Sequence, residues 1–387
     1  MSNRENNKKL ESIQRILIDK QMDACIITSP VNQFWLCEFI FDGYLYILPE
    51  GDPILFVRRP FNLNDNRAVF IRKPEQITDL LQEMKHQLPK RIMMETDYLS
   101  YNTTLRLQKA LNTNEVSNIS TNLRKLRTIK TSVELAQIKK SAEIHSEVYK
   151  MIPSLYRKGM TDIELQIEIE REMRLNGSLG IFRSFGENMD IFMGSLLAGD
   201  NAQAASPFDY ALGGEGISPI LPLGANGSIL KSGTTVMIDM AGNYKPYMDD
   251  MSRTFVIEHA PDSAYFAHNI SIKIHDAIKD IAKPGTLCSD IYNIAIDIVK
   301  ENNLEDYFMG TSQQAKFIGH GVGLEINEPP VFTSRSNEIL EIGMAFALEP
   351  KFVLPKIGAV GIENTYIVNE DGLENITLCE EEIIILT

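Results

Sequence analysis

Two acidic pairs lie inside stretches that otherwise have the composition of apolar β-strands. The first stretch, TTVMIDMAGNYKPYMDDMSRTFVI, has two strand-like runs around the turn-rich GNYKP and predicts an antiparallel hairpin. If its loop centres on Tyr244 and Lys245, then Asp239 and Asp250 lie directly opposite each other. Two carboxylates side by side among apolar residues repel each other unless a cation lies between them. The hairpin therefore predicts a cation site.

A second stretch, FALEPKFVLPKIGAVGIENTYIV, repeats this arrangement closer to the C-terminus. A turn around Lys356 sets Glu349 opposite Glu363. A solvated hairpin face explains either acidic pair taken alone, because most acidic side chains are exposed. Two pairs that are both embedded in apolar strands favour one shared binding site.

The segment FIGHGVGLEINEPP adds an imidazole to these carboxylates. His320 lies among Gly319, Gly321 and Gly323, which permit close backbone approach and unusual dihedral angles. Four carboxylates and one histidine suit two divalent ions held ~3.5 to 4 Å apart by bridging carboxylates. Oxygen-rich ligation favours Mn²⁺ as the first choice, with Co²⁺, Zn²⁺ or Fe²⁺ as alternatives, over a metal selected by thiolates.

Helices and a separate N-terminal region must position these hairpins. From about residue 8 to 125, apolar runs such as DACIIT and ILFV alternate with helix-like segments, which predicts a small α/β domain. Two capping boxes then predict helix starts, Thr131 with Glu134 and Thr161 with Glu164. Two further helices are expected over 262–282 and 289–303. A chain of 387 residues is long enough for two domains, and we place them at 1–128 and 129–387.

Composition excludes several classes of partner. The net charge is −14, with 52 acidic against 38 basic residues and no long basic run, which argues against nucleic acid and anionic membranes. The first residues are polar without a following apolar core, and no later segment approaches the ~18 apolar residues of a membrane span. The four cysteines have no paired ligand spacing, so a disulfide framework or zinc ribbon has no support. We expect a cytoplasmic protein.

These motifs together resemble the pita-bread metallohydrolase family of Xaa-Pro aminopeptidases, prolidases, methionine aminopeptidases and creatinase. IDMAGNYKPYMDDMSRT, GHGVGLEINEPP, ALEP and GIENT resemble its metal-binding motifs, and the likeness covers nearly the whole chain. It implies a creatinase-type α/β N-terminal domain, an α+β pita-bread catalytic domain and a homodimer. It also implies five metal ligands: Asp239, Asp250, His320, Glu349 and Glu363.

Three positions depart from the family pattern. Proline-specific members carry a histidine seven residues after the position of His320, and here Asn327 stands there. They carry another histidine upstream, which AGDNAQAASPFDYALGG lacks, and an arginine where this chain has Gly361. Asn327 either donates its neutral amide to oxyanion charge or caps a turn before EPP, and in the first case activity on Xaa-Pro peptides should be weak.

The resulting hypothesis is a metal-dependent hydrolase of a small peptide or amide substrate, in which a metal-activated water attacks the carbonyl. Glu349 is the candidate to carry the proton to the leaving amine. Arg183 is a candidate to hold a substrate carboxylate, and Tyr247 and Arg253 are candidates to support the metal ligands.

Two alternatives remain open at this point. One is a related metal enzyme that acts on a non-peptide C–N bond, which the missing histidines favour. The other is a non-catalytic scaffold, although a scaffold has no chemical need for four opposed carboxylates.

Overall fold

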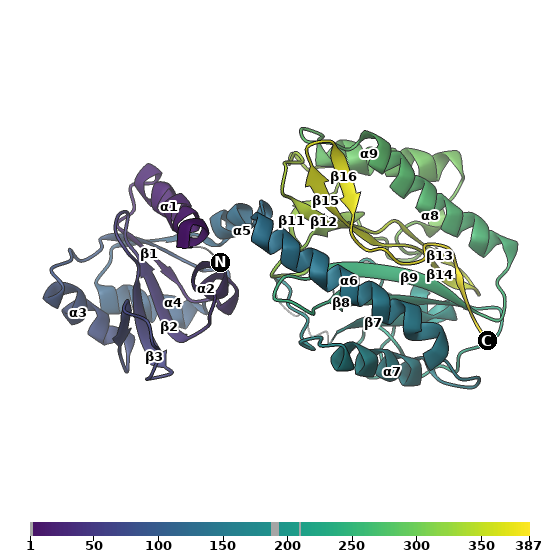
Figure 1. Ribbon diagram of the computed structural model, residues 1–387, viewed down its shortest axis with the longest axis horizontal. Coiled ribbons are helices and arrows are strands. Elements are labelled where there is room, and N and C mark those ends of the chain that lie inside the picture. The colour runs from purple at the N-terminus through teal and green to yellow at the C-terminus, as the bar shows by residue number, and fades with distance from the viewer. Residues whose placement is uncertain (1–2, 187–192, 209) are drawn as a thin grey trace. The chain divides into compact units, whose positions relative to one another are not determined.

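The structure is a computed structural model that describes residues 3–186, 193–208 and 210–387. The chain divides into two compact units, Met1–Arg127 and Thr128–Thr387 (Figure 1).

The first unit is built around a six-stranded mixed sheet with the strand order β4-β3-β2-β1-β5-β6. Strand β1 pairs antiparallel with β2 and parallel with β5. The apolar stripe of α1 buries Ile13 and Leu17 completely, and the α/β class predicted for this region is confirmed. Its elements are α1 (Asn3–Asp19), β1 (Ala24–Ile27), α2 (Pro30–Cys37), β2 (Asp42–Ile47), β3 (Ile54–Arg59), β4 (Ala68–Phe70), η1 (Pro74–Gln76), α3 (Ile77–Glu83), β5 (Arg91–Met94), α4 (Tyr101–Leu111), β6 (Glu115–Asn118) and α5 (Ser120–Thr128).

The second unit carries all of the candidate metal ligands. Its helices are α6 (Ser132–Leu155), α7 (Asp162–Leu175), η2 (Gly199–Gln203), α8 (Asp262–Ile281), α9 (Cys288–Glu301) and η3 (Glu305–Tyr307). Its strands are β7 (Gly194–Ala198), β8 (Thr235–Gly242), β9 (Asp249–Ile257), β10 (Gly319–Gly321), β11 (Glu328–Val331), β12 (Ala345–Leu348), β13 (Lys351–Leu354), β14 (Gly358–Gly361), β15 (Asn364–Asn369), β16 (Gly372–Asn375) and β17 (Ile384–Leu386).

Two helix pairs cover the strands of this unit from opposite sides (Figure 1). Helices α6 and α7 share a buried apolar cluster with the sheet β17-β9-β8-β7. Helices α8 and α9 share another cluster with the sheet β11-β10-β12-β15-β16 and the hairpin β13-β14. The candidate ligands therefore lie on or directly beside strands that are backed by two separate hydrophobic cores.

Both capping boxes form as predicted. At the start of α6, the hydroxyl of Thr131 accepts the N–H of Glu134 at 3.3 Å, and the Glu134 carboxylate accepts the N–H of Thr131 at 2.8 Å. Thr161 and Glu164 repeat this exchange at the start of α7. Each box satisfies N–H groups that have no partner within the helix. Among the described residues, no helix combines the length and the apolar character that a membrane span needs.

Candidate metal centre

Strands β8 and β9 form the predicted hairpin, but the predicted pairing of its aspartates is wrong. Asp239 lies opposite Ser252, and Asp250 lies opposite Ala241. The loop therefore centres one residue later than expected, which moves the register by two. Because side chains alternate between the faces of a strand, both carboxylates still lie on one face, as diagonal neighbours instead of direct partners.

The second hairpin has the predicted register. Strand β13 pairs Lys351 with Gly361, and β12 pairs Leu348 with Asn364. The two ladders share one register. If that register is extended across the residues between the ladders, Glu349 lies opposite Glu363. Lys356 has a φ of +67° within the connecting turn, as expected for a residue at a tight reversal.

His320 lies on β10, the short strand between β11 and β12. A Cβ atom on Gly319 would lie 2.3 Å from the carbonyl oxygen of Ala347, and one on Gly321 would lie 2.1 Å from that of Pro329. These glycines therefore permit close backbone approach, as predicted. The unusual dihedral angles expected beside the histidine are not found, because neither glycine has a positive φ.

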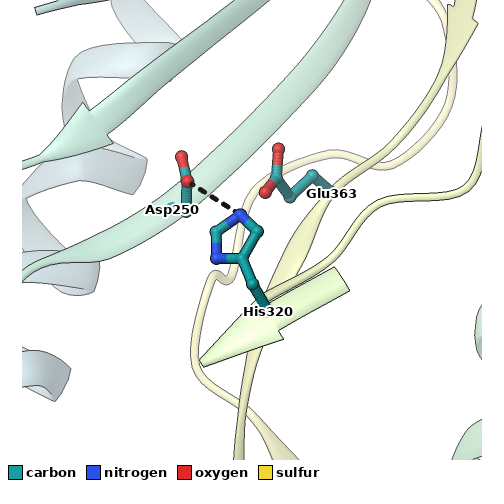
Figure 2. A group of neighbouring side chains, drawn as sticks. All are labelled: Asp250, His320 and Glu363. Atoms are coloured by element: carbon teal, nitrogen blue, oxygen red, sulfur yellow. Dashed lines mark ion pairs between the residues drawn. The ribbon is translucent and has the colours of Figure 1, made fainter. Parts of the chain in front are cut away.

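The five candidate ligands converge in two overlapping groups. One ligand atom each from Asp250, His320 and Glu363 lie within 4.8 Å of one another, and so do atoms from Asp239, Glu349 and Glu363. Figure 2 shows the imidazole of His320 directed toward Asp250, with Glu363 beside them. The Nε2 atom of His320 lies 3.9 Å from Asp250 and 3.4 Å from Glu349. A mixed set of carboxylates and imidazole suits a divalent ion at the first group.

A lysine that sequence reasoning missed occupies the second group. Lys351 is completely buried, and its Nζ atom donates to Asp239 at 2.8 Å, to Glu349 at 2.7 Å and to Glu363 at 3.0 Å. The residues present therefore fit one ion at Asp250, and an ammonium group stands where a second ion was expected. Lys351 follows Glu349 by two residues, so strand alternation alone places it on the same face.

Burial and mutual repulsion disturb the titration of these groups. Burial raises the pKa of Asp250 well above its ordinary value, and the charges of Glu363, Asp239 and Glu349 raise it further. Burial also raises the pKa of Glu363 to about 8, although Lys351 opposes this shift. Burial acts against the charge on Glu349 as well, but Lys351 and His320 lower its pKa to about 2. The acidic cluster therefore needs positive charge to remain ionised.

The same cluster determines the charge of its two basic members. Burial acts to lower the pKa of Lys351, but Asp239, Glu349 and Glu363 raise it well above its ordinary value. Burial also acts to lower the pKa of His320, whereas its contact with Glu349 raises it. Lys351 is therefore a permanent ammonium at neutral pH.

Neighbouring residues hold the carboxylates through side chain and backbone. The Ser252 hydroxyl donates to the Glu363 carboxylate at 2.6 Å. Thr365 accepts the N–H of Asp250 at 2.9 Å and donates to its carbonyl at 2.8 Å. Arg253 is completely buried and donates to the backbone carbonyls of Ser252 and Glu363, so it supports the centre from behind. Ser252 follows Asp250 by two residues, which is the signal that could have found it.

Tyr247 supports the unit at a greater distance from the centre. Its hydroxyl donates to the carboxylate of Glu134 in α6, and its carbonyl accepts the hydroxyl of Ser141 at 2.9 Å. These contacts fix the loop between β8 and β9 to the helix α6.

Helix α8 holds the backbone on both sides of the second hairpin. Ser271 donates to the carbonyl of Pro350 at 2.6 Å and accepts the N–H of Ile362 at 3.1 Å. Pro350 follows Glu349 directly and Ile362 precedes Glu363 directly. One hydroxyl therefore fixes the backbone next to both glutamates.

Two histidines of α8 add to this support. The Nδ1 atom of His268 accepts the N–H of Gly361 at 3.2 Å. Nε2 of His275 donates to the carbonyl of Ile362 at 3.2 Å, and its Nδ1 accepts the hydroxyl of Tyr366 at 2.9 Å. Burial lowers the pKa of His268 to about 4 and that of His275 to about 3. Both rings are neutral at neutral pH, and each uses one nitrogen as an acceptor.

The side chain of Asn327 makes contacts within the protein. Its amide nitrogen donates to the carbonyl of Phe185 at 2.7 Å, and its oxygen accepts the N–H of Phe185 at 2.7 Å. The N–H of Ile326 also donates to the carbonyl of Arg183 at 2.7 Å. Asn327 therefore clamps the segment that carries Arg183, while Arg183 itself is half-buried outside the two ligand groups.

A cavity of about 330 Å³ lies on the His320 side of the centre. Its lining includes Phe208, Tyr210 and Phe317, and the ring of Phe317 lies 6.3 Å from that of His320. Burial raises the pKa of Tyr210, and the charges of Asp239 and Asp250 raise it further. The segment in which the family's upstream histidine is missing thus contributes aromatic side chains to this cavity.

Two family models match the chain. Residues 9–129 match the Creatinase/Prolidase N-terminal domain, and residues 136–370 match Metallopeptidase family M24. The second match alone covers more than half of the chain.

Relatives and solved structures agree with these matches along the full length. The Xaa-Pro dipeptidase of Pyrococcus furiosus is 25% identical over 384 residues, covering 97% of this chain and 99% of the relative. The structure of Xaa-Pro dipeptidase from Bacillus anthracis superposes with a TM-score of 0.82 at 25% identity, over 98% of this chain and 100% of that one. X-Pro aminopeptidase from Thermotoga maritima shares the fold, with a TM-score of 0.79 at 20% identity over 96% and 99% of the two chains.

The α/β first unit and the pita-bread second unit thus correspond to the two matched models. Carboxylates and a histidine that lie far apart in the sequence meet inside the second unit. On this evidence the chain is a member of metallopeptidase family M24 with a creatinase/prolidase N-terminal domain.

Proposed function

We propose that the chain hydrolyses Xaa-Pro dipeptides with the help of a divalent metal ion. The observation that carries this proposal is the convergence of four carboxylates and His320 in two overlapping groups of ligand atoms. It is supported by full-length relatives named Xaa-Pro dipeptidase at 25% identity.

The metal ligands are proposed to come from the side chains that the sequence predicted: Asp239, Asp250, His320, Glu349 and Glu363. Of the two groups that these residues form, the one of Asp250, His320 and Glu363 is not filled by Lys351. Mn²⁺ is the first choice, because oxygen donors with one imidazole suit it, and Co²⁺, Zn²⁺ and Fe²⁺ suit the same donors. Asp239 and His320 are the more exposed members, with 29% and 14% of their side chains accessible. Substrate is therefore proposed to approach from their side.

A bound divalent ion supplies Lewis acidity and lowers the pKa of a coordinated water toward ~7. Glu349 is the proposed proton carrier, because its carboxylate lies inside the candidate centre, 3.4 Å from Nε2 of His320. Its Oε1 faces His320, whereas Oε2 is held by Lys351. One oxygen is thus fixed in place, and the other can take a proton from water and pass it to the leaving amine.

Two features are proposed to bind the ends of the dipeptide. Arg183 is proposed to hold the C-terminal carboxylate, because guanidinium and carboxylate pair well and Asn327 clamps the segment that carries it. The cavity lined by Phe208, Tyr210 and Phe317 is proposed to receive an apolar part of the substrate.

The test compares one Xaa-Pro dipeptide with its C-terminal amide and with a longer Xaa-Pro peptide. The metal-loaded protein is expected to prefer the free dipeptide, because only that substrate presents a carboxylate next to the proline. Arg183→Leu is expected to remove the preference, lowering kcat/KM for the dipeptide ~10- to 100-fold, as suits the loss of a charge-assisted hydrogen bond. The reaction of the amide should change little.

Arg171→Leu is the matched control, because Arg171 is an exposed arginine on α7. Its kinetics should equal those of the parent. Hydrolysis of non-peptide amides without hydrolysis of any Xaa-Pro peptide would favour the C–N bond enzyme instead and would contradict the proposal.

A cytoplasmic location and a homodimer are proposed on the sequence and the family resemblance alone. Light scattering on the purified protein tests the homodimer, because a monomer at micromolar concentration would contradict it.

A further inference from the structure

The second group of ligand atoms already contains a cation. The carboxylates of Asp239, Glu349 and Glu363 lie within 4.8 Å of one another, and the Nζ atom of Lys351 lies 2.7 to 3.0 Å from all of them. The ammonium group of a lysine has three N–H donors and no acceptor. Each donor of Lys351 therefore has its own carboxylate, and the group is fully satisfied.

The position of this ammonium is fixed by the strand that carries it. Lys351 is the first residue of β13 and pairs with Gly361 of β14. Its carbonyl accepts the N–H of Met309 at 2.8 Å, and its own N–H donates to the Met309 sulfur at 3.4 Å. The whole residue is buried, so its ammonium is shielded from bulk water. Removing it from the carboxylates would leave a charge buried without a partner.

We propose that this protein binds a single divalent ion, at Asp250, His320 and Glu363, and that the ammonium of Lys351 takes the place of the second ion. The inference rests on the proposed metal-dependent function and narrows it to a one-metal centre. A divalent ion placed between Asp239, Glu349 and Glu363 would have to share their oxygens with Nζ. Two cations at that separation repel each other strongly in a buried site.

The remaining ligand set is sufficient for one ion. Two carboxylates and one imidazole supply three protein ligands, and catalytic metal sites commonly have three and keep a further position open for water or substrate. Lys351 also shares Glu363 with this ion, since Glu363 belongs to both groups. The carboxylate of Glu363 thus lies between the proposed divalent ion and the ammonium of Lys351, as a bridging carboxylate lies between the two ions of a two-metal site.

Metal content and the electron paramagnetic resonance spectrum of Mn²⁺ test the inference without reference to activity. The parent protein is saturated with Mn²⁺, desalted and analysed for metal per chain. We expect about one ion, with the spectrum of an isolated Mn²⁺, because the second position of a two-metal site at ~3.5 to 4 Å is filled. Lys351→Gly, which opens that position, is expected to hold about two ions with an exchange-coupled spectrum.

Lys351→Met fills the position without charge and is expected to stay at about one ion. Lys130→Met is the matched control, because Lys130 is another buried lysine with a carboxylate partner, Glu328 at 3.1 Å, in the same unit. Its metal content should equal that of the parent.

A parent that holds about two coupled ions overturns the inference and leaves the metallopeptidase function intact. A Lys351→Gly variant that folds but stays at one ion also overturns it. A parent that holds no ion contradicts both this inference and the proposed function. Because Lys351→Gly can fail to fold, anomalous diffraction from parent crystals with Mn²⁺ provides a second measurement: one peak beside Asp250 supports the inference, and a peak at the Nζ position overturns it.

Discussion

The side-chain amide of Asn327 makes two hydrogen bonds to the backbone of one residue, Phe185, one as donor and one as acceptor. An amide that is held in this way has a structural duty, since it fixes the segment that carries Arg183. Donation to substrate, the role suggested by the sequence, would have to use the second N–H of the same NH₂ group.

Variants of Asn327 separate the two roles. Asn327→Ala loses both hydrogen bonds, and at about 1 kcal/mol each it should lower kcat/KM for an Xaa-Pro dipeptide roughly 10-fold or more at unchanged metal content. Asn327→Asp keeps the hydrogen-bond acceptor but loses the donor, so its kcat/KM should lie between those of the parent and Asn327→Ala. If the two hydrogen bonds to Phe185 are the main role of this side chain, Asn327→His is expected to lower turnover as well. Increased turnover for Asn327→His at matched metal occupancy would show instead that an oxyanion donor was missing.

Strand alternation explains which residues of the site the sequence could and could not identify. The carboxylates and His320 were recognisable because acidic residues inside apolar strands need a partner. Lys351 and Ser252 follow ligands by two residues, so the same rule placed them on the ligand face, yet neither type is a usual metal ligand. Sequence alone could not tell whether Lys351 turns inward, because that depends on how three carboxylates from different strands meet.

At the scale of the element, α8 holds the glutamate hairpin through neutral histidines. His268 accepts the N–H of Gly361, and His275 donates to the carbonyl of Ile362. Their pKa values in the folded protein, about 4 and about 3, lie below the ordinary 6.5 because both rings are buried. Between pH 6.5 and about 4 the unfolded chain therefore binds protons that the folded chain does not.

The contribution of these two histidines to the free energy of unfolding should accordingly be fully present above pH 6.5 and decrease as the pH drops toward 4. Each histidine contributes a slope of about 1.4 kcal/mol per pH unit in this window. His275→Gln should remove one such slope, whatever its effect on stability at pH 7. Urea unfolding at several pH values, followed by circular dichroism, measures this slope.

The single tryptophan, Trp35, lies in the first unit, so its fluorescence gives an internal reference that His275→Gln should not change. His259→Gln is the control in the second unit, because that side chain is exposed in the folded protein and stays in water on unfolding. An unchanged pH slope in His275→Gln would contradict the burial of a neutral ring.

The β8–β9 hairpin marks the limit of prediction for elements. Its existence and its apolar strands followed from composition and turn residues, but its register depended on the loop. Lys245 donates its N–H to Ser141 of α6 at 3.0 Å, a tertiary contact that local sequence does not reveal. A shift of two residues keeps both aspartates on one face of the hairpin, so they remain neighbours despite the error in pairing.

On the scale of the whole molecule, the resemblance of the metal-binding motifs to a known family implied the pita-bread architecture, and alternating apolar runs and helix-like segments predicted the α/β first unit. The domain division at residue 128 stays a prediction, and expression of 129–387 alone tests whether it folds. The substrate is the least predictable property, because the substrate contacts that we propose, Arg183 and the cavity at Tyr210, lie on segments outside the helices and strands.

Turnover of one Xaa-Pro dipeptide during metal removal and return is the most direct measurement of the central proposal. The parent is stripped with a chelator, checked for residual metal and titrated with Mn²⁺, with Asp250→Ala treated in parallel. We predict that turnover disappears with the metal, returns in proportion to bound Mn²⁺ in the parent, and does not return in Asp250→Ala. Turnover that persists in fully stripped protein, or that is absent from the parent at full metal occupancy, would contradict a metal-dependent Xaa-Pro peptidase.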